Sequence, residues 1–589
     1  MEQDRSTVWK YSLVMSLVLL PLAAALIAQE ELPPLTEEVE LRVVNVDVVV
    51  VDRKGEPIRG LEKGDFELFE DGKPVEITNF FTYAEPDPPA IEDREWAEND
   101  GSGIDIPPSR EPLVLAIYLD ENNVPPFARK RILQDLAPVL EAWAVEGAQF
   151  LYLRRANRLL VEAGPTSNPQ DVLAALSSDP ATTRGVEVQL EYQRALEAIE
   201  AEYVGCANSF GCDPCDNGFP QLVALARRYA EEQQARLETA SFGAADVVSV
   251  LSGVRGRKAV LYITEALPQS PGLAVFNMLG QVCPERIRDG DQNALEYDET
   301  TRLNVLASQA NANRVVFYTL DAGGLRGFSA ADASGPSFGS SGSSSTDPLP
   351  SFIPSARIDN VRITNLQNSL FQIADETGGK AILNANRPRE DLIRMRDDLL
   401  STYSLGFVPQ HERTGRIHLL EVRLKDGRKA RLRYRKAYRD KDQEELLGER
   451  LLSKLYLSKT DRTAQADNPL GVSLSIGEAR RLNRRSDTLP VEIRLSRSAV
   501  TVLPGGSAEA PVARLRVWMT ALGSRGHLPL RQELIEFTAD DVRLEDDFLS
   551  FVVDIDLRRE KQTLGVGLRD EISGEESLAV VEMEFDASS

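Results

Sequence analysis

The stretch from residue 111 to residue 407 alternates short apolar runs with longer segments of helical periodicity, and this alternation constrains the fold more than any other feature. The run from Leu113 to Leu119 is apolar throughout and ends in Asp120. In the segment 125–144 that follows, apolar residues recur every three or four positions, which predicts a helix. Strands that are apolar on both faces are typical of a sheet covered by helices on both sides. The pattern therefore predicts an α/β fold with a doubly wound, mostly parallel sheet of the Rossmann-like type.

Further segments of the same two kinds follow along the chain. Apolar runs predict strands at 150–153, 258–264, 315–320, 381–383 and 403–407, and helical periodicity predicts helices at 168–177, 186–203, 219–251, 300–312, 362–376 and 388–401. We place the limits of this α/β domain at 111 and 440, with closing strands in 416–436. A Gly/Ser-rich stretch at 329–350 predicts a flexible excursion within it.

Different patterns on both sides predict additional domains. Residues 36–85 contain a Val-rich run and an Asp71-Gly72 turn between alternating segments, which is typical of a small β domain. Residues 86–110 are rich in Pro and acidic residues and predict a linker. Residues 441–465 predict a charged helical linker. Short alternating segments separated by turns predict a β-sandwich at 466–589.

The first 28 residues have the features of an export signal. Arg5 and Lys10 precede an uncharged apolar run from Tyr11 to Ala28, which ends in small residues. This pattern predicts a signal peptide, and the run is also just long enough to be an uncleaved membrane anchor. In both cases the rest of the chain is expected outside the cytoplasm, in the periplasm, in the cell envelope or outside the cell.

The chain contains four cysteines, which an exported protein is expected to pair in disulfides. The sequence leaves three pairings open. The spacing Cys212-x-x-Cys215 also occurs in zinc and redox sites, but a zinc ribbon needs a second close pair, which is absent from this sequence. A redox pair follows a strand and opens a helix, whereas this pair lies in a polar stretch. The four residues are Cys206, Cys212, Cys215 and Cys283.

The charge of the chain excludes some classes of partner. The formal net charge is -25, and no long stretch is basic. Proteins that bind nucleic acid need a basic surface to displace counterions, and an acidic surface is repelled by anionic lipid. We therefore expect no nucleic-acid partner, and contact with a membrane only through an N-terminal anchor.

Six segments together resemble a bacterial family of exported proteins related to the von Willebrand factor A (VWA) domain. The resemblance spans about residues 40–440, and its specificity comes from the order and spacing of the segments. It implies a VWA fold for the α/β domain, binding of other proteins, and no assigned reaction. The segments are 52–55 with 60–72, the strand that ends at Asp120, 256–265, 316–321, 374–379, and 403–407 with the basic strand that continues through Tyr438.

The resemblance also implies a divalent-cation site at the carboxyl ends of the strands. In VWA domains an Asp-x-Ser-x-Ser loop, a Thr and a later Asp supply oxygen ligands, and the partner protein supplies the last one. In this chain Val124 replaces the second Ser and offers no ligand, while Asn122 replaces the first Ser with an amide oxygen. We expect Asp120 to face solvent at this edge. The candidate ligands are Asp120, Asn122, Thr182 or Thr183, and Glu265, with Thr183 preferred.

Two interpretations of these residues remain open. The retained oxygens are compatible with a weakened or altered Mg²⁺ or Ca²⁺ site. Alternatively, no metal binds, and Asp120 and Asn122 only cap the helix that follows. Both interpretations describe a protein that mediates protein–protein interaction or adhesion at the cell envelope, with a degenerate metal-ion-dependent site and no certain cofactor.

The sequence gives little support to a catalytic function. The chain has three histidines, His411, His418 and His527, and none belongs to a motif with a candidate nucleophile. Residues 335–339 match the letters of a nucleophile elbow, but they lie in the Gly/Ser-rich stretch rather than between a strand and a helix. We expect no enzyme. The alternatives that stay open are a secreted hydrolase with an unidentified carboxylate site and a purely structural envelope component.

Overall fold

The computed structural model describes most of the chain after residue 42. The N-terminal export signal, the linker 86–110, the Gly/Ser-rich stretch and both Thr182 and Thr183 lie outside the described residues. Among the helices of the described part, each is too short or too polar to cross a lipid bilayer. The described ranges are 43–83, 111–143, 148–156, 158–178, 188–265, 267–325, 352, 354–425, 427, 429–460, 468–503, 512–538 and 547–583.

A six-stranded sheet forms the centre of the α/β part. Numbered along the chain from β5, its strands are arranged in the order 3-2-1-4-5-6, which is the order of a doubly wound sheet. All neighbours are parallel except the edge strand β7, which is antiparallel to β6. The predicted α/β fold with a mostly parallel sheet is confirmed. In spatial order the strands are β10 (Ala381–Ile382), β9 (Val315–Asp321), β8 (Arg257–Thr264), β5 (Leu113–Asp120), β6 (Gln149–Arg155) and β7 (Leu159–Thr166).

Helices bury both faces of this sheet. Side chains of β5 alternate between the two faces, so Leu115 and Ile117 join one core and Ala116 and Tyr118 join the other. The first core is completed by α1 (Pro126–Ala142), α2 (Pro169–Ser178) and α9 (Arg389–Leu400). The second is completed by α4 (Phe219–Ser252), α7 (Thr300–Ala312) and α8 (Ala356–Glu376). Burial on both faces explains why the strands are apolar throughout.

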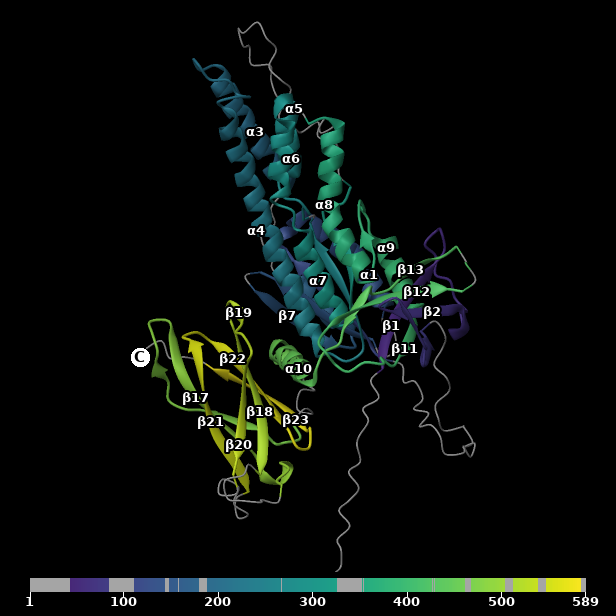
Figure 1. Ribbon diagram of the computed structural model, residues 1–589, viewed down its shortest axis with the longest axis vertical. Coiled ribbons are helices and arrows are strands. Elements are labelled where there is room, and N and C mark those ends of the chain that lie inside the picture. Colours follow the sequence, from purple (N-terminus) through teal and green to yellow (C-terminus); the bar gives the residue numbers. More distant parts are fainter. Residues whose placement is uncertain are drawn as a thin grey trace, which may run out of the picture. The chain divides into compact units, whose positions relative to one another are not determined.

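A group of helices, the helical extension, continues beyond the carboxyl edge of the sheet (Figure 1). Helix α4 ends five residues before β8 begins, so it runs back along the sheet from the carboxyl edge to the amino edge. Its 34 residues span about 50 Å, whereas an eight-residue strand spans about 26 Å. The first half of α4 therefore lies beyond the strand ends. There it shares a separate core with α3 (Val188–Ala207), α5 (Leu273–Val282) and the region of α6 (Ile287–Leu295), next to α8.

Two disulfides lie in this extension. Cys206 pairs with Cys212 in the connection between α3 and α4, and Cys215 pairs with Cys283 at the end of α5. The expected disulfides are present, and the pairing that the sequence left open is decided. Because Cys212 and Cys215 belong to different disulfides, they form neither a redox pair nor half of a zinc site.

The N-terminal β strands do not form a domain of their own. Strand β1 (Val44–Val51) pairs with β11 (Tyr403–Phe407), and β2 (Phe66–Glu70) pairs with β12 (Ile417–Leu424). This differs from the sequence-based boundaries, which placed 36–85 apart and assigned 403–440 to the α/β domain. Pairing between strands more than 300 residues apart depends on the packed fold and leaves no local signal. The remaining strands of this β part are β3 (Lys73–Val75), β4 (Asn79–Thr82), β13 (Arg431–Arg433) and β14 (Ala437–Arg439).

The C-terminal part consists of two antiparallel sheets that enclose one core, as in the predicted β-sandwich. The segment predicted as a helical linker contains α10 (Gln443–Leu457). One side of this helix is buried against its neighbours. Leu447 and Leu451 pack against Trp518 of the sandwich, and the Ser453 hydroxyl donates to the Val250 carbonyl of α4 (2.7 Å). One sheet contains β15 (Ser473–Ile476), β16 (Arg480–Arg481), β17 (Ser486–Ser496) and β21 (Phe548–Arg558); the other contains β18 (Ala513–Gly523), β19 (Gly526–His527), β20 (Arg531–Phe537), β22 (Gln562–Asp570) and β23 (Glu576–Met583).

Candidate functional site at the carboxyl edge

The strand order places Asp120 at the point where a doubly wound sheet binds its ligands. Strand β5 begins the series, and the chain adds β6 on one side of it and β8 on the other. Doubly wound sheets bind ligands at this switch point, which here lies between the carboxyl ends of β5 and β8. Asp120 is the last residue of β5, and Thr264 is the last residue of β8, followed directly by Glu265. The fold therefore brings these two chain segments together, as the sequence predicts.

The carboxylate of Asp120 is held by neutral donors. Its Oδ2 atom accepts hydrogen bonds from Asn123 Nδ2 (2.7 Å), the Tyr262 hydroxyl (3.3 Å) and the Thr264 hydroxyl (3.4 Å). Its Oδ1 atom is buried and has no hydrogen-bond partner among the described residues. Burial raises the pKa of Asp120 above its ordinary value, although these hydrogen bonds and the charge of Arg155 act in the opposite direction. The site therefore disfavours the charged carboxylate.

The expectation that Asp120 faces solvent is wrong, because the residue is 0% exposed. The loop after β5 folds over it instead of leaving it open. Asn123 donates to its carboxylate, and the backbone N–H of Glu265 donates to the carbonyl of Asn123 (2.9 Å). Val124 and Glu265 are also buried. The loops after β5 and β8 thus close on each other above the aspartate.

The capping interpretation is also wrong. Helix α1 begins at Pro126, and its N-cap residue is Pro125, several residues after Asp120. The short 3-10 turn at 121–123 follows Asp120, but no side-chain cap hydrogen bond is formed there. Asn122 instead donates through Nδ2 to the carbonyl of Ala156, at the end of β6 (2.9 Å). The two polar residues stabilise loops rather than a helix end.

Several residues at this edge have contacts that the motif comparison did not anticipate. Tyr262 stacks on Tyr118 with ring centroids 4.9 Å apart, and burial raises the pKa of both phenols well above the usual range. Thr264 donates to Asp120, and Asp321 ends the neighbouring strand β9, where it accepts from the N–H of Gly323 (3.0 Å). Thr264 and Asp321 are the last residues of their strands. Their position at strand ends is the sequence signal that could have identified them.

These residues do not complete the oxygen shell that Mg²⁺ or Ca²⁺ requires. Such ions take six or more oxygen ligands. Asp120 retains one unpartnered oxygen, Val124 offers none, Asn122 is held through its amide nitrogen by the Ala156 carbonyl, and Thr183 lies outside the described residues. Within the described part, Asp120 does not belong to any group of three His, Cys, Asp or Glu side chains with ligand atoms within 4.8 Å of one another. The buried pocket fits a hydrogen-bonded aspartate better than a hard cation.

Two apolar side chains are exposed at this same edge. Phe127 lies in the first turn of α1 and is 60% exposed, and Leu325 follows the end of β9 and is 64% exposed. Arg131, one turn after Phe127, donates to the carbonyl of Ala322 (2.7 Å), which joins α1 to the loop after β9. We refer to Phe127, Arg131 and Leu325 as the rim surface. It gives the edge a solvent-exposed apolar component.

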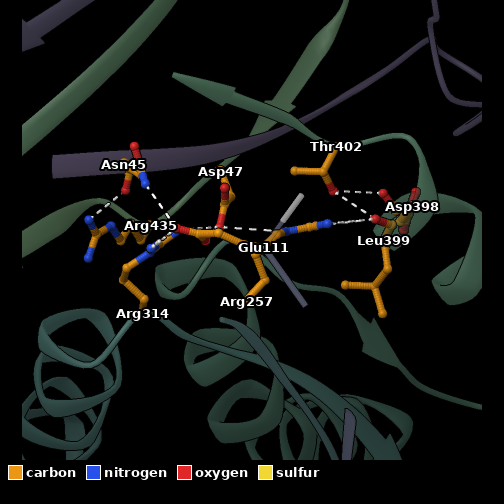
Figure 2. Close-up of polar contacts among 9 residues, drawn as sticks. All are labelled: Asn45, Asp47, Glu111, Arg257, Arg314, Asp398, Leu399, Thr402 and Arg435. Atoms are coloured by element: carbon orange, nitrogen blue, oxygen red, sulfur yellow. Dashed lines mark hydrogen bonds and ion pairs between the residues drawn. The ribbon is translucent and has the colours of Figure 1, made fainter. Parts of the chain in front are cut away.

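A second cluster of charges, some buried and some partly buried, lies at the opposite, amino edge of the sheet (Figure 2). Arg257 is the first residue of β8, Arg314 precedes β9, and Glu111 precedes β5. Arg314 is bonded to both oxygens of Glu111 (3.2 and 3.0 Å) and to Asp47 of β1 (3.3 Å). Arg257 donates to the carbonyl of Leu399 through both terminal nitrogens (3.2 Å each) and lies 3.8 Å from Asp47. The network joins the β part to the central sheet.

The charge balance of this amino-edge cluster differs from that of Asp120. Burial alone would raise the pKa of Asp47, but Arg314 and Arg257 outweigh it and hold that pKa below its ordinary value. Arg435 donates to the carbonyl of Asn45 (2.7 Å), and burial lowers its pKa to about 9. The terminal nitrogens of the three arginines join segments, whereas their Nε atoms and Asp47 Oδ1 are buried without a hydrogen-bond partner among the described residues. The contacts of the cluster connect β1 to the first residues of the central strands, which is a structural role.

Comparison with known proteins adds little to this geometry. No family model matches the chain, and no curated protein matches it. Among solved structures, the chain matches the crystal structure of an aerotolerance-related membrane protein from Bacteroides fragilis that carries multiple mutations to serine. The match has 13% sequence identity, covers 48% of this chain and 98% of that chain, and has a TM-score of 0.21. At this TM-score it carries no argument about fold or function.

Proposed function

We propose that this chain is an exported, non-enzymatic VWA-like protein that binds a partner protein at the carboxyl edge of its central sheet. The observation that carries the proposal is the 3-2-1-4-5-6 strand order with an antiparallel edge strand, which puts Asp120 and Glu265 at the switch point. The order and spacing of the six sequence segments support kinship with the VWA-related family.

The rim surface supplies the chemistry of binding. Exposed aromatic side chains are frequent among residues that dominate protein–protein affinity, and Phe127 stands at this edge on a rigid helix. Since the carboxylate of Asp120 is buried and held by Asn123, we propose that recognition does not depend on a metal ion and that the ancestral site is degenerate. Asp120 then acts by fixing the loops that present the rim surface.

The location outside the cytoplasm is part of the proposal. Two disulfides are present in the helical extension, and disulfides persist in oxidising compartments. The apolar N-terminal stretch of the sequence has the pattern of an export signal. The envelope is therefore the place in which to search for the partner.

The partner search uses the full mature chain as bait in an envelope extract. The test variant is Phe127→Asp, and the matched control is Phe548→Asp, which changes a phenylalanine of similar exposure (54%) in the sandwich. We expect a captured protein to be lost with Phe127→Asp and retained with Phe548→Asp, in both EDTA and Mg²⁺. Loss with the Phe548 variant alone would move recognition to the sandwich and overturn the proposal.

A titration tests the degenerate metal site directly. Mg²⁺ and Ca²⁺ are added to the full chain in a calorimeter, with Asp120→Asn as the comparison. We expect no saturable heat of Mg²⁺ or Ca²⁺ binding that is present in the wild type and absent from Asp120→Asn. We also expect neither ion to shift the melting temperature. A one-to-one binding curve that this variant abolishes would show that the site still takes a hard cation, and the metal-independent part of the proposal would be rejected.

A further inference from the structure

Two of the three histidines of the chain lie together with three carboxylates, those of Glu70, Asp71 and Asp440, on strands and loops outside the central sheet. Glu70 ends β2 and Asp71 follows it in the turn to β3. His418 lies on β12, which pairs with β2, and His411 lies in the connection between β11 and β12. The histidine rings stack with centroids 4.1 Å apart. Strand pairing thus assembles a cluster that no sequence motif indicates.

His418 is oriented as metal-binding histidines are. Its Nδ1 atom lies 2.9 Å from Asp71 Oδ2, and the same aspartate accepts a backbone hydrogen bond from Leu419 through Oδ1 (2.9 Å). A carboxylate oxygen accepts hydrogen bonds, and Asp71 also accepts one from a backbone N–H, so Nδ1 of His418 is the protonated atom in this contact. A carboxylate that receives Nδ1–H fixes the tautomer in which Nε2 offers a lone pair.

The Nε2 atom of His418 differs from the other ring nitrogens of the cluster, which all have polar neighbours. His418 is 9% exposed, and its Nε2 is buried and has no hydrogen-bond partner among the described residues. A buried nitrogen acceptor without a donor is unfavourable, because its hydration is lost without replacement. A bound cation would satisfy it.

His411 and Glu70 supply the other ligand atoms. His411 Nε2 lies 3.2 Å from Glu70 Oε1 and 3.2 Å from the Tyr438 hydroxyl, which itself donates to Glu70 Oε1. His411 Nδ1 lies 3.0 Å from the carbonyl oxygen of Glu412, which can only accept, so Nδ1 is the protonated atom in that contact. His411 Nε2 faces the Glu70 carboxylate, which also only accepts, so a metal ion bound there replaces a proton at Nε2.

We propose that Glu70, His411 and His418 form a binding site for a divalent transition-metal ion of the zinc class, with Asp71 as the residue that orients His418. One ligand atom from each of the three lies within 4.8 Å of the other two. Two imidazoles and one carboxylate suit Zn²⁺, Co²⁺ or Ni²⁺ and are a poor set for Mg²⁺ or Ca²⁺. The site is thus separate in chemistry as well as in position from Asp120.

Binding requires one movement. A metal ion lies in the plane of each imidazole that binds it, whereas the two stacked rings are only 16° from parallel. One ring must turn out of the stack. His418 is held on a strand by Asp71, whereas His411 lies outside the strands and its side chain is 29% exposed, so His411 is the residue that turns. The ion then replaces the contact of His411 Nε2 with Glu70.

The ion would connect distant parts of the chain. Glu70 and His411 are 341 residues apart, and Asp71 and His418 are 347 residues apart. A ligand that binds only the folded chain raises the melting temperature by an amount that grows with the logarithm of the ratio of free ligand concentration to Kd. The expected role is to fasten the N-terminal strands to the returning strands β12 and β14 in an environment where free zinc is available.

The test is metal binding by the full mature chain, produced without a polyhistidine tag and dialysed against EDTA. Co²⁺ is followed by its visible absorption, and Zn²⁺ by calorimetry and by melting temperature. The test variant is His418→Ala and the matched control is His527→Ala, which removes the remaining histidine, located in the sandwich. We expect one ion per chain, with binding lost in His418→Ala, unchanged in His527→Ala, and weakened about tenfold or more in Asp71→Asn.

Additional measurements keep the test decisive. If His418→Ala does not fold, His411→Ala on the more exposed ring serves in its place, because its loss removes a ligand without opening the core. Asp120→Asn must retain Zn²⁺ binding, which separates this site from the carboxyl edge. Equal Zn²⁺ affinity in the wild type and both histidine variants, or no saturable Zn²⁺ or Co²⁺ binding by the wild type, would overturn the proposal.

Discussion

The two edges of the central sheet both bury a carboxylate, but they surround it differently. At the amino edge, Asp47 faces the guanidinium groups of Arg314 and Arg257, and its pKa is lowered. At the carboxyl edge, Asp120 faces the amide of Asn123 and hydroxyl groups, and burial raises its pKa. Burial raises the pKa of both carboxylates, and Arg314 and Arg257 outweigh it at Asp47, whereas the hydrogen bonds and Arg155 do not outweigh it at Asp120.

This difference separates a structural cluster from a candidate binding edge. The arginines of the amino edge come from β8 and from the residue before β9, and they fasten β1 to the sheet through ionic contacts. The carboxyl edge is extended by helices whose connections are closed by disulfides, and it exposes the rim surface. The amino edge is therefore held by ionic contacts, whereas hydrogen bonds close the loops at the carboxyl edge and disulfides close the helical extension beyond it.

The largest expected effect concerns the covalent links. The Cys215–Cys283 disulfide joins residues with a sequence separation of 68, whereas the Cys206–Cys212 disulfide joins residues with a sequence separation of 6. By loop-closure entropy, loss of the first should lower the free energy of unfolding by about 4 kcal/mol and loss of the second by about 2 kcal/mol. Urea unfolding of the two double Cys→Ala variants measures this. Equal losses would show that loop length does not set the stabilisation of the extension.

The next largest effect is expected at the amino edge. Asp47→Asn removes the carboxylate that faces Arg314 and Arg257, so both guanidinium groups lose a negatively charged partner. We expect the free energy of unfolding to fall by about 3 kcal/mol. The control is Asp397→Asn, which removes a partly exposed ion pair with Arg396 and should cost less than about 1 kcal/mol. If both variants lose the same small amount, the amino-edge cluster does not hold the β part in place.

The two edges should respond to pH in opposite directions. The lowered pKa of Asp47 stabilises the fold above its unfolded value near 3.8, and this contribution is lost as pH falls through the folded pKa. The raised pKa of Asp120 stabilises the fold below that unfolded value, and this contribution is lost as pH rises through the folded pKa. Urea unfolding across pH should therefore show that Asp47→Asn costs most at neutral pH and little in acid. A pH-independent cost would contradict the charge assignment.

The smallest effect is expected at the carboxyl edge. Asp120→Asn keeps an oxygen that can accept from Asn123 and removes the need to bury a charge. At neutral pH we expect the free energy of unfolding to rise slightly, because the variant buries no charge, and the difference to vanish in acid. Asp120→Ala, which leaves the Asn123 and Tyr262 donors without their acceptor, should instead destabilise the fold. A marked loss with Asp120→Asn would indicate a charged aspartate with a bound cation.

Local pattern determined much of the α/β architecture. The predicted helices 219–251 and 300–312 correspond to α4 (Phe219–Ser252) and α7 (Thr300–Ala312), and Asp120 ends a buried strand as expected. Such elements can be predicted from the sequence because burial of one face or both gives their apolar residues a regular spacing. The edge strand β7 contains Gly164 and Pro165 and is only partly buried, so its periodicity is weak and it was missed.

The tertiary structure alone decided the pairing of β1 with β11, the two disulfides, the closure of the loops over Asp120 and the meeting of Glu70 with His411 and His418. Each of these features joins residues through contacts whose geometry no local segment encodes. Periodicity records which side of an element is buried but not which other element covers it. For this reason the sequence by itself determined the sheet and the strand end that carries Asp120, whereas the environment of that residue and the histidine cluster emerged only from the packed chain.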